Sequence, residues 1–346
     1  MEGHRSEGPV RDAGAAATRL VVARHGRGRS PFEEDIVPVV EIEDLVKTYD
    51  GRNVVDGLSL TVEPGEILGI LGRNGAGKTT TVECAVGLRK PDGGRVRVLG
   101  VDPRKERARV QQVVGVQLQK GHPHGALTVR EQVRLYRSFH HHGLDPDDLI
   151  DRLGLGEVRD TGSEKLSGGQ YQRLNIALAL VGRPRIAVLD ELTTGLDSAA
   201  RREMWRLIEE MRADGLTIIL VSHFMEEAER LSDRIAVIDA GKLVALDTPT
   251  GLIGRVAGAD AVSFRAHAPL DPAVLTALPG VTDVTVEEDL VRVSGQGELV
   301  KEVTAALMHH EVPATDFRTH TATLDDAFLQ LTGQELGEPV VAAEPK

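Results

Sequence analysis

The sequence predicts an α/β fold, with a main domain built on a buried parallel sheet and a small α+β domain after it. Two short apolar runs, Ile67 to Leu71 and Ile186 to Leu189, end in glycine-rich and acidic residues respectively. Such runs are typical of parallel strands that are covered on both faces and carry functional groups at their carboxyl ends. After residue 252 the pattern restarts in the order β-α-β-β-α-β, which predicts a ferredoxin-like second domain.

The length and composition of the chain fit this division. Its 346 residues suit about two domains of roughly 150 residues each, and 41% hydrophobic residues can fill ordinary cores. The N-terminal segment is rich in Gly, Ala, Arg and Pro, a composition that buries too little surface to order a chain. We expect a disordered tail over residues 1–37, the main domain over 38–252, the small α+β domain over 253–334 and a flexible tail over 335–346.

Charge and cysteine content narrow the classes of function. The formal net charge of -12 argues against a nucleic-acid partner, because binding a phosphate backbone needs a basic face. No apolar run approaches the roughly 18 residues that cross a bilayer. The single cysteine, Cys84, suits a reducing compartment. We therefore expect a cytoplasmic protein that does not itself span the membrane.

The first apolar run leads into a phosphate-binding motif. The segment Gly72-Arg73-Asn74-Gly75-Ala76-Gly77-Lys78-Thr79 matches the P-loop spacing at every required position. Its glycines allow backbone N–H groups to approach phosphate oxygens, and a helix predicted from Thr79 to Gly87 would place its positive end beneath them. Lys78 would contact the β- and γ-phosphates, and the Thr79 hydroxyl would bind Mg²⁺. The predicted nucleotide contacts are Gly72, Asn74, Gly75, Ala76, Gly77, Lys78, Thr79 and Thr80.

The second apolar run leads into a pair of acids, Asp190 and Glu191. Alternation along a strand would turn their side chains to opposite faces. Asp190 would then hold the Mg²⁺ shell, while Glu191 would face the attacking water as the general base. The alternative, in which both acids only cap the next helix, is weakened by the phosphate-binding motif upstream.

A further motif separates this chain from other P-loop proteins, such as kinases, GTPases and helicases. The segment Leu166-Ser167-Gly168-Gly169-Gln170 resembles the signature sequence of ABC ATPases, and a helix-compatible stretch follows it to about Val181. A hydroxyl and two glycines at a helix start form a second anion site. The resemblance implies a P-loop NTPase fold of the ABC nucleotide-binding type, with a helical signature subdomain. It also implies a head-to-tail homodimer that holds ATP between the P-loop of one copy and Ser167, Gly168, Gly169 and Gln170 of the other.

Other positions follow the order of the family. Tyr49 resembles the aromatic residue that stacks on adenine, and Gln119 resembles the glutamine that contacts Mg²⁺ and senses the membrane partner. Gln117 remains an alternative candidate for that glutamine. Asp197 lies in a segment similar to the loop that couples the two sites, and His223 resembles the histidine that senses the γ-phosphate. The resemblance thus implies Lys78, Glu191 and His223 as catalytic residues, and Thr79, Gln119 and Asp190 as metal ligands.

The resemblance covers about residues 40–250 and departs from the family at Leu192, where proline is common. Leucine restores a backbone N–H and frees φ. The departure therefore bears on the stiffness of the loop that holds Glu191, and not on the acidity of Glu191.

The C-terminal segment Thr323 to Leu329 is similar to the tail of drug-resistance exporter cassettes of the daunorubicin (ABC-2) type. This resemblance implies ATP hydrolysis coupled to export through a separate transmembrane permease, at the cytoplasmic face of the membrane. The alternative is a soluble non-transport ABC ATPase of the repair, chromosome or ribosome-associated type. The single copy of each motif, and the lack of a long heptad insertion between Gly72 and Leu166, count against it. Intact Lys78, Asp190, Glu191 and His223 disfavour a cassette that binds ATP without hydrolysing it.

Overall fold

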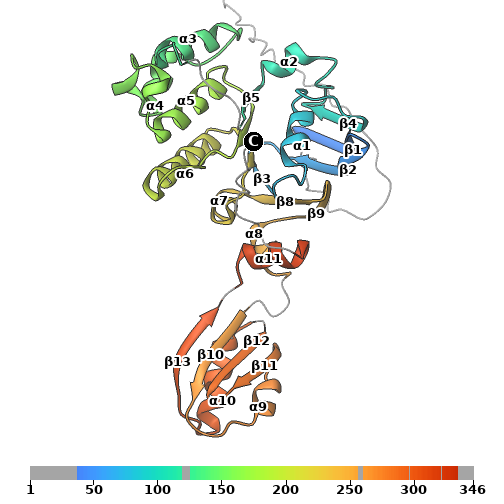
Figure 1. The fold of residues 1–346 in the computed structure, drawn as a ribbon, viewed down its shortest axis with the longest axis vertical. Coiled ribbons are helices and arrows are strands. Elements are labelled where there is room, and N and C mark those ends of the chain that lie inside the picture. Colours follow the sequence, from blue (N-terminus) through green and yellow to red (C-terminus); the bar gives the residue numbers. More distant parts are fainter. Residues whose placement is uncertain (1–36, 119–124, 256–259, 296, 321, 334–346) are drawn as a thin grey trace, which may run out of the picture. The chain divides into compact units, whose positions relative to one another are not determined.

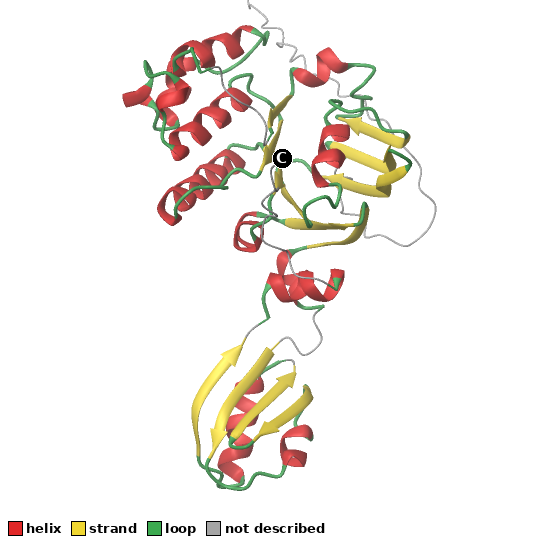
Figure 2. Cartoon of the chain, in the orientation of Figure 1, coloured by secondary structure: helices red, strands yellow, loops and turns green. Residues whose placement is uncertain are grey.

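The structure is a computed structural model that describes residues 37–118, 125–255, 260–295, 297–320 and 322–333. The predicted tails, apart from Val37, lie outside the described residues, as does the predicted metal ligand Gln119. Three sheets organise the described part of the chain (Figures 1 and 2).

The main domain contains a central six-stranded sheet and a three-stranded antiparallel sheet. The central sheet has the order β5-β6-β7-β3-β8-β9, in which β8 and β9 pair antiparallel and the other neighbours pair parallel. Its strands are β3 (Ile67–Leu71), β5 (Val114–Gln117), β6 (Ile186–Asp190), β7 (Thr217–Val221), β8 (Arg234–Asp239) and β9 (Lys242–Asp247). The second sheet, in the order β2-β1-β4, is formed by β1 (Val40–Tyr49), β2 (Arg52–Val62) and β4 (Gly93–Val98).

Several helices of the main domain start at side-chain caps. The Thr128 side chain accepts a hydrogen bond from the Glu131 N–H, and the Glu131 carboxylate accepts one from the Thr128 N–H. This reciprocal capping box satisfies two N–H groups that a helix start leaves unpaired. The helices are α1 (Lys78–Ala85), α2 (Arg107–Gln111), α3 (Val129–Ser138), α4 (Pro146–Arg152), α5 (Gly168–Leu180), α6 (Ser198–Ala213), α7 (Met225–Leu231) and α8 (Pro249–Ile253), with 3₁₀ turns at Gly156–Val158 and Ser163–Lys165.

The central sheet separates two apolar cores. On β6, Ile186 and Val188 belong to the core that contains α1 and the three-stranded sheet, whereas Ala187 and Leu189 belong to the core that contains α5 and α6. Strand alternation causes this division, because successive side chains point to opposite faces of a sheet. Helices α1 and α5, which begin at the two glycine-rich motifs, therefore pack on opposite faces of the central sheet.

The second domain has a four-stranded antiparallel sheet in the order β11-β12-β10-β13. Its core joins strand residues such as Val262 and Val293 to helix residues such as Leu275 and Val303. The element order is the predicted β-α-β-β-α-β. The elements are β10 (Asp260–Ala266), α9 (Pro272–Thr276), β11 (Val281–Glu287), β12 (Leu290–Gly295), α10 (Leu299–His309) and β13 (Ala314–His320).

The last helix, α11 (Leu324–Thr332), corrects the predicted boundary between the domains. Its residues Ala327 and Phe328 are buried in one core with Leu71 and Leu252 of the main domain, and the helix contacts α7, α8 and β9. The sequence places this helix in the second domain because it follows β13 directly. An apolar helix face shows that a helix is packed, but not against which core.

Candidate nucleotide-binding site

Neighbouring strands of the central sheet bring the predicted site residues to one edge. Strand β6 ends at Asp190, which lies opposite Val221 of β7, and Val221 in turn lies opposite Ile70 of β3. Strand β5 pairs with β6 on the other side and ends at Gln117. Because the carboxyl ends of parallel strands meet at one edge, segments far apart in the sequence converge here.

The glycine-rich loop after β3 has a backbone that only glycine fits at two points. Gly77 has a φ of 101°, and a Cβ there would lie 2.5 Å from the Val54 carbonyl oxygen. A Cβ at Gly72 would lie 2.3 Å from the Ile238 carbonyl oxygen. Close packing beneath the loop leaves Asn74 and Gly75 exposed above it. The loop thus offers backbone at its surface, as binding of a phosphate requires.

Lys78 is held at this loop by backbone oxygens. Its ammonium nitrogen donates hydrogen bonds to the carbonyls of Gly72, at 2.7 Å, and Arg73, at 3.0 Å. Burial lowers the pKa of Lys78, while the nearby charges of Glu191 and Asp190 act to raise it. The charge is therefore kept close to the exposed backbone, where phosphate oxygens could take the place of the carbonyls.

Thr79 and Asp190 meet at the same edge, as predicted for two ligands of one metal ion. The Thr79 hydroxyl donates to the Asp190 carboxylate across 3.4 Å. Burial and the neighbouring charge of Glu191 raise the pKa of Asp190 to about 6. A hydroxyl beside a buried carboxylate that lacks full compensation fits Mg²⁺, which prefers oxygen ligands. Among the described residues there is no cluster of three His, Cys, Asp or Glu side chains. Mg²⁺ commonly binds through one or two carboxylates together with substrate phosphates and water.

The Gln117 side chain supports the backbone of Asp190, a role that the sequence does not predict. Gln117 is buried, and its side-chain oxygen accepts a hydrogen bond from the Asp190 N–H at 3.0 Å. This bond extends the pairing of β5 with β6 by one position beyond the last strand residue. The feature of the sequence that could have indicated this role is a polar residue, Gln117, at the end of an apolar strand. The assignment of Gln119 as a metal ligand stays a prediction.

Asp190→Asn is expected to stabilise the Mg²⁺-free protein at pH 7. The pKa of Asp190 rises on folding from 3.8 to about 6, so its stabilising contribution is complete below pH 3.8 and is lost as the pH rises through about 6. The increase in the free energy of unfolding that the Asp190→Asn substitution causes should be largest at pH 7 and should shrink as the pH falls toward 4. Urea unfolding of both proteins with EDTA, from pH 4 to 7, measures this difference. A gain that does not change with pH would contradict the expected burial of a charged Asp190.

Glu191 and His223 approach one another at the same edge. The Nδ1 atom of His223 lies 3.5 Å from Oε1 of Glu191. Strand alternation does not describe Glu191, because β6 ends at Asp190 and Glu191 takes a φ of 51°, in the left-handed region. The sequence predicted that strand alternation turns the side chains of Asp190 and Glu191 to opposite faces. This reason is wrong, because Glu191 lies in a turn and not in the strand. Leu192, at the departure from the family, is fully buried in the core of α5 and α6, so packing anchors this turn.

The predicted signature residues lie at the exposed start of α5. The Ser167 side chain accepts a hydrogen bond from the Gln170 N–H at 3.3 Å, and the Gln170 side chain accepts one from the Ser167 N–H at 2.9 Å. A Cβ at Gly169 would lie 3.7 Å from the Cβ of Ala200, which places the signature beside the first turn of α6. Both Ser167 and Gly168 are exposed.

Asp197 caps helix α6. Its carboxylate accepts hydrogen bonds from the N–H groups of Ala199, at 2.9 Å, and Ala200, at 2.8 Å. Capping explains the aspartate without any partner molecule. Its predicted coupling role stays a prediction.

Tyr49 lies at the end of β1, near the far end of α1. Lys47 and Arg89 place their cationic groups 5.1 Å and 5.4 Å from the centre of its ring. Its stacking on adenine remains a prediction.

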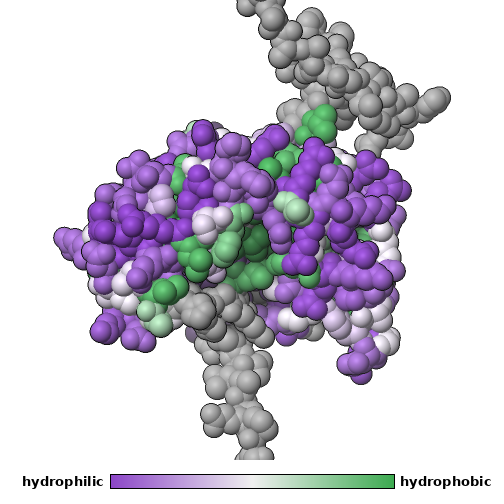
Figure 3. Space-filling model, turned by 90° about the horizontal axis from the view of Figure 1, so that it is seen from above, coloured by the Kyte–Doolittle hydropathy of each residue, from purple (hydrophilic) through white to green (hydrophobic). Residues whose placement is uncertain are grey.

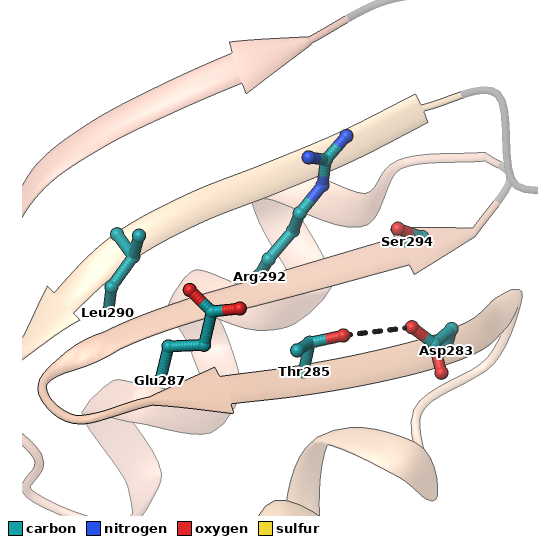
Figure 4. A pocket seen from close by; sticks show the side chains of 6 residues that line it. All are labelled: Asp283, Thr285, Glu287, Leu290, Arg292 and Ser294. Carbon is teal, nitrogen blue, oxygen red and sulfur yellow. Dashed lines mark hydrogen bonds between the residues drawn. The ribbon is translucent and has the colours of Figure 1, made fainter.

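A shallow depression lies on the sheet of the second domain, outside this site (Figure 4). Its lining comes from β11 and β12, and the Thr285 hydroxyl donates to Asp283 at 3.1 Å. Acidic groups and Arg292 project from the same strands. This surface supplies no nucleophile or metal cluster, and we assign it no chemistry. The lining residues are Asp283, Thr285, Glu287, Leu290, Arg292 and Ser294.

Comparison with known proteins gives consistent matches over this region. Residues 55–194 match the family described as ABC transporter. The chain is 36% identical over 308 residues to the Nod factor export ATP-binding protein I of Paraburkholderia xenovorans, covering 86% of this chain and 98% of that protein. It is 34% identical over 306 residues to the daunorubicin resistance ATP-binding protein DrrA3 of Streptomyces coeruleorubidus, covering 86% and 96%. Both alignments are longer than residues 40–253, so they extend into the second domain.

Solved structures resemble the main domain. The cbiO1 subunit of a Clostridium perfringens ABC transporter complex has a TM-score of 0.57 and 27% identity, over 63% of this chain and 91% of that one. An ATP-binding cassette of another ABC transporter has a TM-score of 0.58 and 25% identity, over 64% of this chain and 95% of that one.

Proposed function

The chain belongs to the family of ABC transporter ATP-binding proteins, and we propose that two copies hydrolyse Mg²⁺-bound ATP at shared sites to drive a separate export permease. The observation that carries the proposal is the packing of α1 and α5 on opposite faces of the central sheet. A P-loop and a signature placed in this way do not close on one triphosphate within one copy. A second copy, turned head to tail, would supply the missing half of each site.

The site residues divide the chemistry among them. Lys78 and the loop N–H groups would bind the β- and γ-phosphates, with Ser167 and Gly169 of the second copy on the other side. Thr79 and Asp190 would hold Mg²⁺, which neutralises charge that develops on the phosphate oxygens. Glu191 would accept a proton from the attacking water. His223, beside Glu191, would contact the γ-phosphate with the ring nitrogen that faces away from Glu191.

Export is supported by the relatives, whose names describe Nod factor export and daunorubicin resistance. Both alignments include the second domain, so the likeness to these relatives extends beyond the nucleotide-binding domain. Among the described residues, no helix has the length and apolarity to cross a bilayer. We therefore infer that a different polypeptide forms the transmembrane pathway, and that this chain acts at the cytoplasmic face.

The surface of α3 and its C-terminal end offers a contact for that permease. Leu135, Tyr136 and Phe139 expose 41%, 38% and 62% of their surface, and the rings of Tyr136 and Phe139 lie 5.9 Å apart. Exposed apolar clusters of this kind often mark protein interfaces. Figure 3 shows a mainly hydrophilic face of the molecule with hydrophobic residues gathered near its centre.

The shared-site proposal predicts that ATPase activity rises more than linearly with protein concentration. Below the dimer dissociation constant the concentration of dimer grows with the square of the concentration of protein, whereas a complete site in each copy gives a straight line. Steady-state phosphate release, measured across a dilution series with saturating Mg²⁺ and ATP, distinguishes the two. A straight line from protein that light scattering shows to be monomeric would contradict shared sites. Co-purification with a membrane protein tests the export role separately.

A further inference from the structure

A series of contacts links residues 194–197, the loop before α6 that is called the Asp197 loop below, to Glu191 within one copy. Arg201 lies in the first turn of α6, where its N–H donates to the Asp197 carbonyl at 2.9 Å. The guanidinium carbon of Arg201 lies 4.7 Å from the centre of the Phe224 ring. Its Nε atom is buried and has no hydrogen-bond partner among the described residues. The face of Phe224 is thus a defined partner for this cation, at a distance where cation–π attraction acts.

Phe224 in turn contacts the predicted γ-phosphate sensor. Its ring lies with its centre 4.1 Å from that of the His223 ring, tilted by 38°. His223 places Nδ1 3.5 Å from Glu191. Since Nδ1 faces Glu191, any rotation of the His223 ring changes both this approach and the direction of the other ring nitrogen. Phe224 therefore contacts the His223 ring, whose orientation sets the approach to Glu191. Arg201 in turn contacts Phe224.

A second contact holds the same two helices together one turn further on. The indole N–H of Trp205, on α6, donates to Glu227 of α7 at 3.2 Å. Glu227 is fully buried, and its other carboxylate oxygen has no hydrogen-bond partner among the described residues. Arg230 lies over the Trp205 ring at 5.1 Å. Helices tied in this way move together, so a shift at the start of α6 reaches the segment before α7 instead of being absorbed between them.

We propose that Arg201 and Phe224 are positioning residues for hydrolysis, which orient the His223 ring according to the position of the Asp197 loop. The inference rests on the proposed function, in which the Asp197 loop and the adjacent signature face the second copy. When the dimer closes, contact with the second copy would hold that loop in place and so restrain the Arg201–Phe224 contact and the approach of His223 to Glu191 that one copy already shows. An isolated copy would leave the ring less constrained. In this proposal the two residues contact neither ATP nor the attacking water, and they act through His223.

Substitutions that remove the cation or the ring test this proposal. Arg201→Met keeps the aliphatic stem, and Phe224→Leu keeps an apolar side chain. Each is expected to lower kcat by about 10- to 100-fold, as small misplacements of a catalytic group do, with little change in KM for ATP. Phe224→Tyr keeps the ring and should retain kcat. The double variant should be no slower than the slower single variant, because both changes break one contact.

Arg206→Met is the matched control, since Arg206 is exposed on the same helix. Thermal unfolding of every variant accompanies the kinetics. Unchanged kcat in Arg201→Met, in a parent protein that hydrolyses ATP, would overturn the positioning role and leave the proposed function intact. A parent protein without ATP turnover would instead overturn the proposed function. Equal losses in Arg206→Met, or losses in kcat that follow a lowered Tm and that Phe224→Tyr does not avoid, would show a structural role only.

Trp205 gives an independent readout, because it is the only tryptophan in the chain. Its emission should change when Mg²⁺-ATP closes the dimer, since Trp205 is bonded across the pair of helices that is proposed to move. The amplitude should be smaller in Arg201→Met, in which the loop no longer restrains Phe224. The same amplitude in both proteins at saturating ATP would contradict transmission through Arg201.

Discussion

Glu191→Gln is expected to lower ATP turnover by about 10²- to 10⁴-fold, the usual contribution of a general base, while ATP binding persists. Glutamine keeps the shape and one acceptor oxygen of the side chain but does not accept a proton from water. Lys78 and Thr79 are untouched, so the phosphate contacts remain. Because ATP is bound and not consumed, the closed dimer should accumulate. Gel filtration with Mg²⁺ and ATP, together with phosphate release, measures both effects.

Glu210→Gln provides the matched control, because Glu210 is an exposed carboxylate on α6 away from the strand edge. It should match the parent in turnover and show no dimer that persists with ATP. If Glu191→Gln hydrolyses ATP as fast as the parent protein, Glu191 is not the base. If Glu191→Gln loses ATP binding as well as turnover, the negative charge of Glu191 is needed for the site to bind ATP.

Mixing two inactive variants is expected to restore activity. Lys78→Ala removes the P-loop charge, and Gly169→Asp adds a carboxylate at the predicted signature, where a Cβ would make only an ordinary 3.7 Å contact and the fold should be retained. In a mixed dimer one site carries both changes and the other carries neither. An equal mixture should therefore reach about a quarter of the parent activity, because half of the dimers are mixed and half of their sites are intact.

The mixed dimers need to be isolated for a clean result, with a different affinity tag on each variant. Phosphate release is then compared between the mixed dimers and each variant alone at the same concentration. Isolated mixed dimers that are no faster than either variant would indicate that P-loop and signature act within one copy. Fast turnover by Gly169→Asp alone would show that Gly169 does not face the phosphates.

The sequence was informative wherever a function is carried by consecutive residues. The P-loop and the signature appear at the starts of α1 and α5, because glycine spacing and capping chemistry are local properties. The β-α-β-β-α-β order of the second domain was also predictable, since short alternating strands and turns mark each element.

Tertiary contacts were the part that the sequence did not predict. Gln117 reaches Asp190 across 73 positions, and Arg201 meets Phe224 only because α6 and α7 pack together. Strand periodicity predicted the wrong reason for the direction of Glu191, because Glu191 has a left-handed φ in the turn after β6, next to the buried Leu192. Helix α11 was assigned to the wrong domain for a related reason, since an amphipathic pattern does not identify the core that it faces.

The packing of the two anion-binding motifs on opposite faces of the central sheet has a consequence for ATP hydrolysis by unassembled protein. A newly synthesised monomer would have its P-loop and its signature on opposite faces of the sheet. Neither of its two ATP sites would be complete, so it would not hydrolyse ATP. Consumption would begin only on pairing, and a permease that seats two copies next to each other would raise their local concentration enough to start it. ATP consumption would then follow the number of assembled exporters more closely than the amount of this chain.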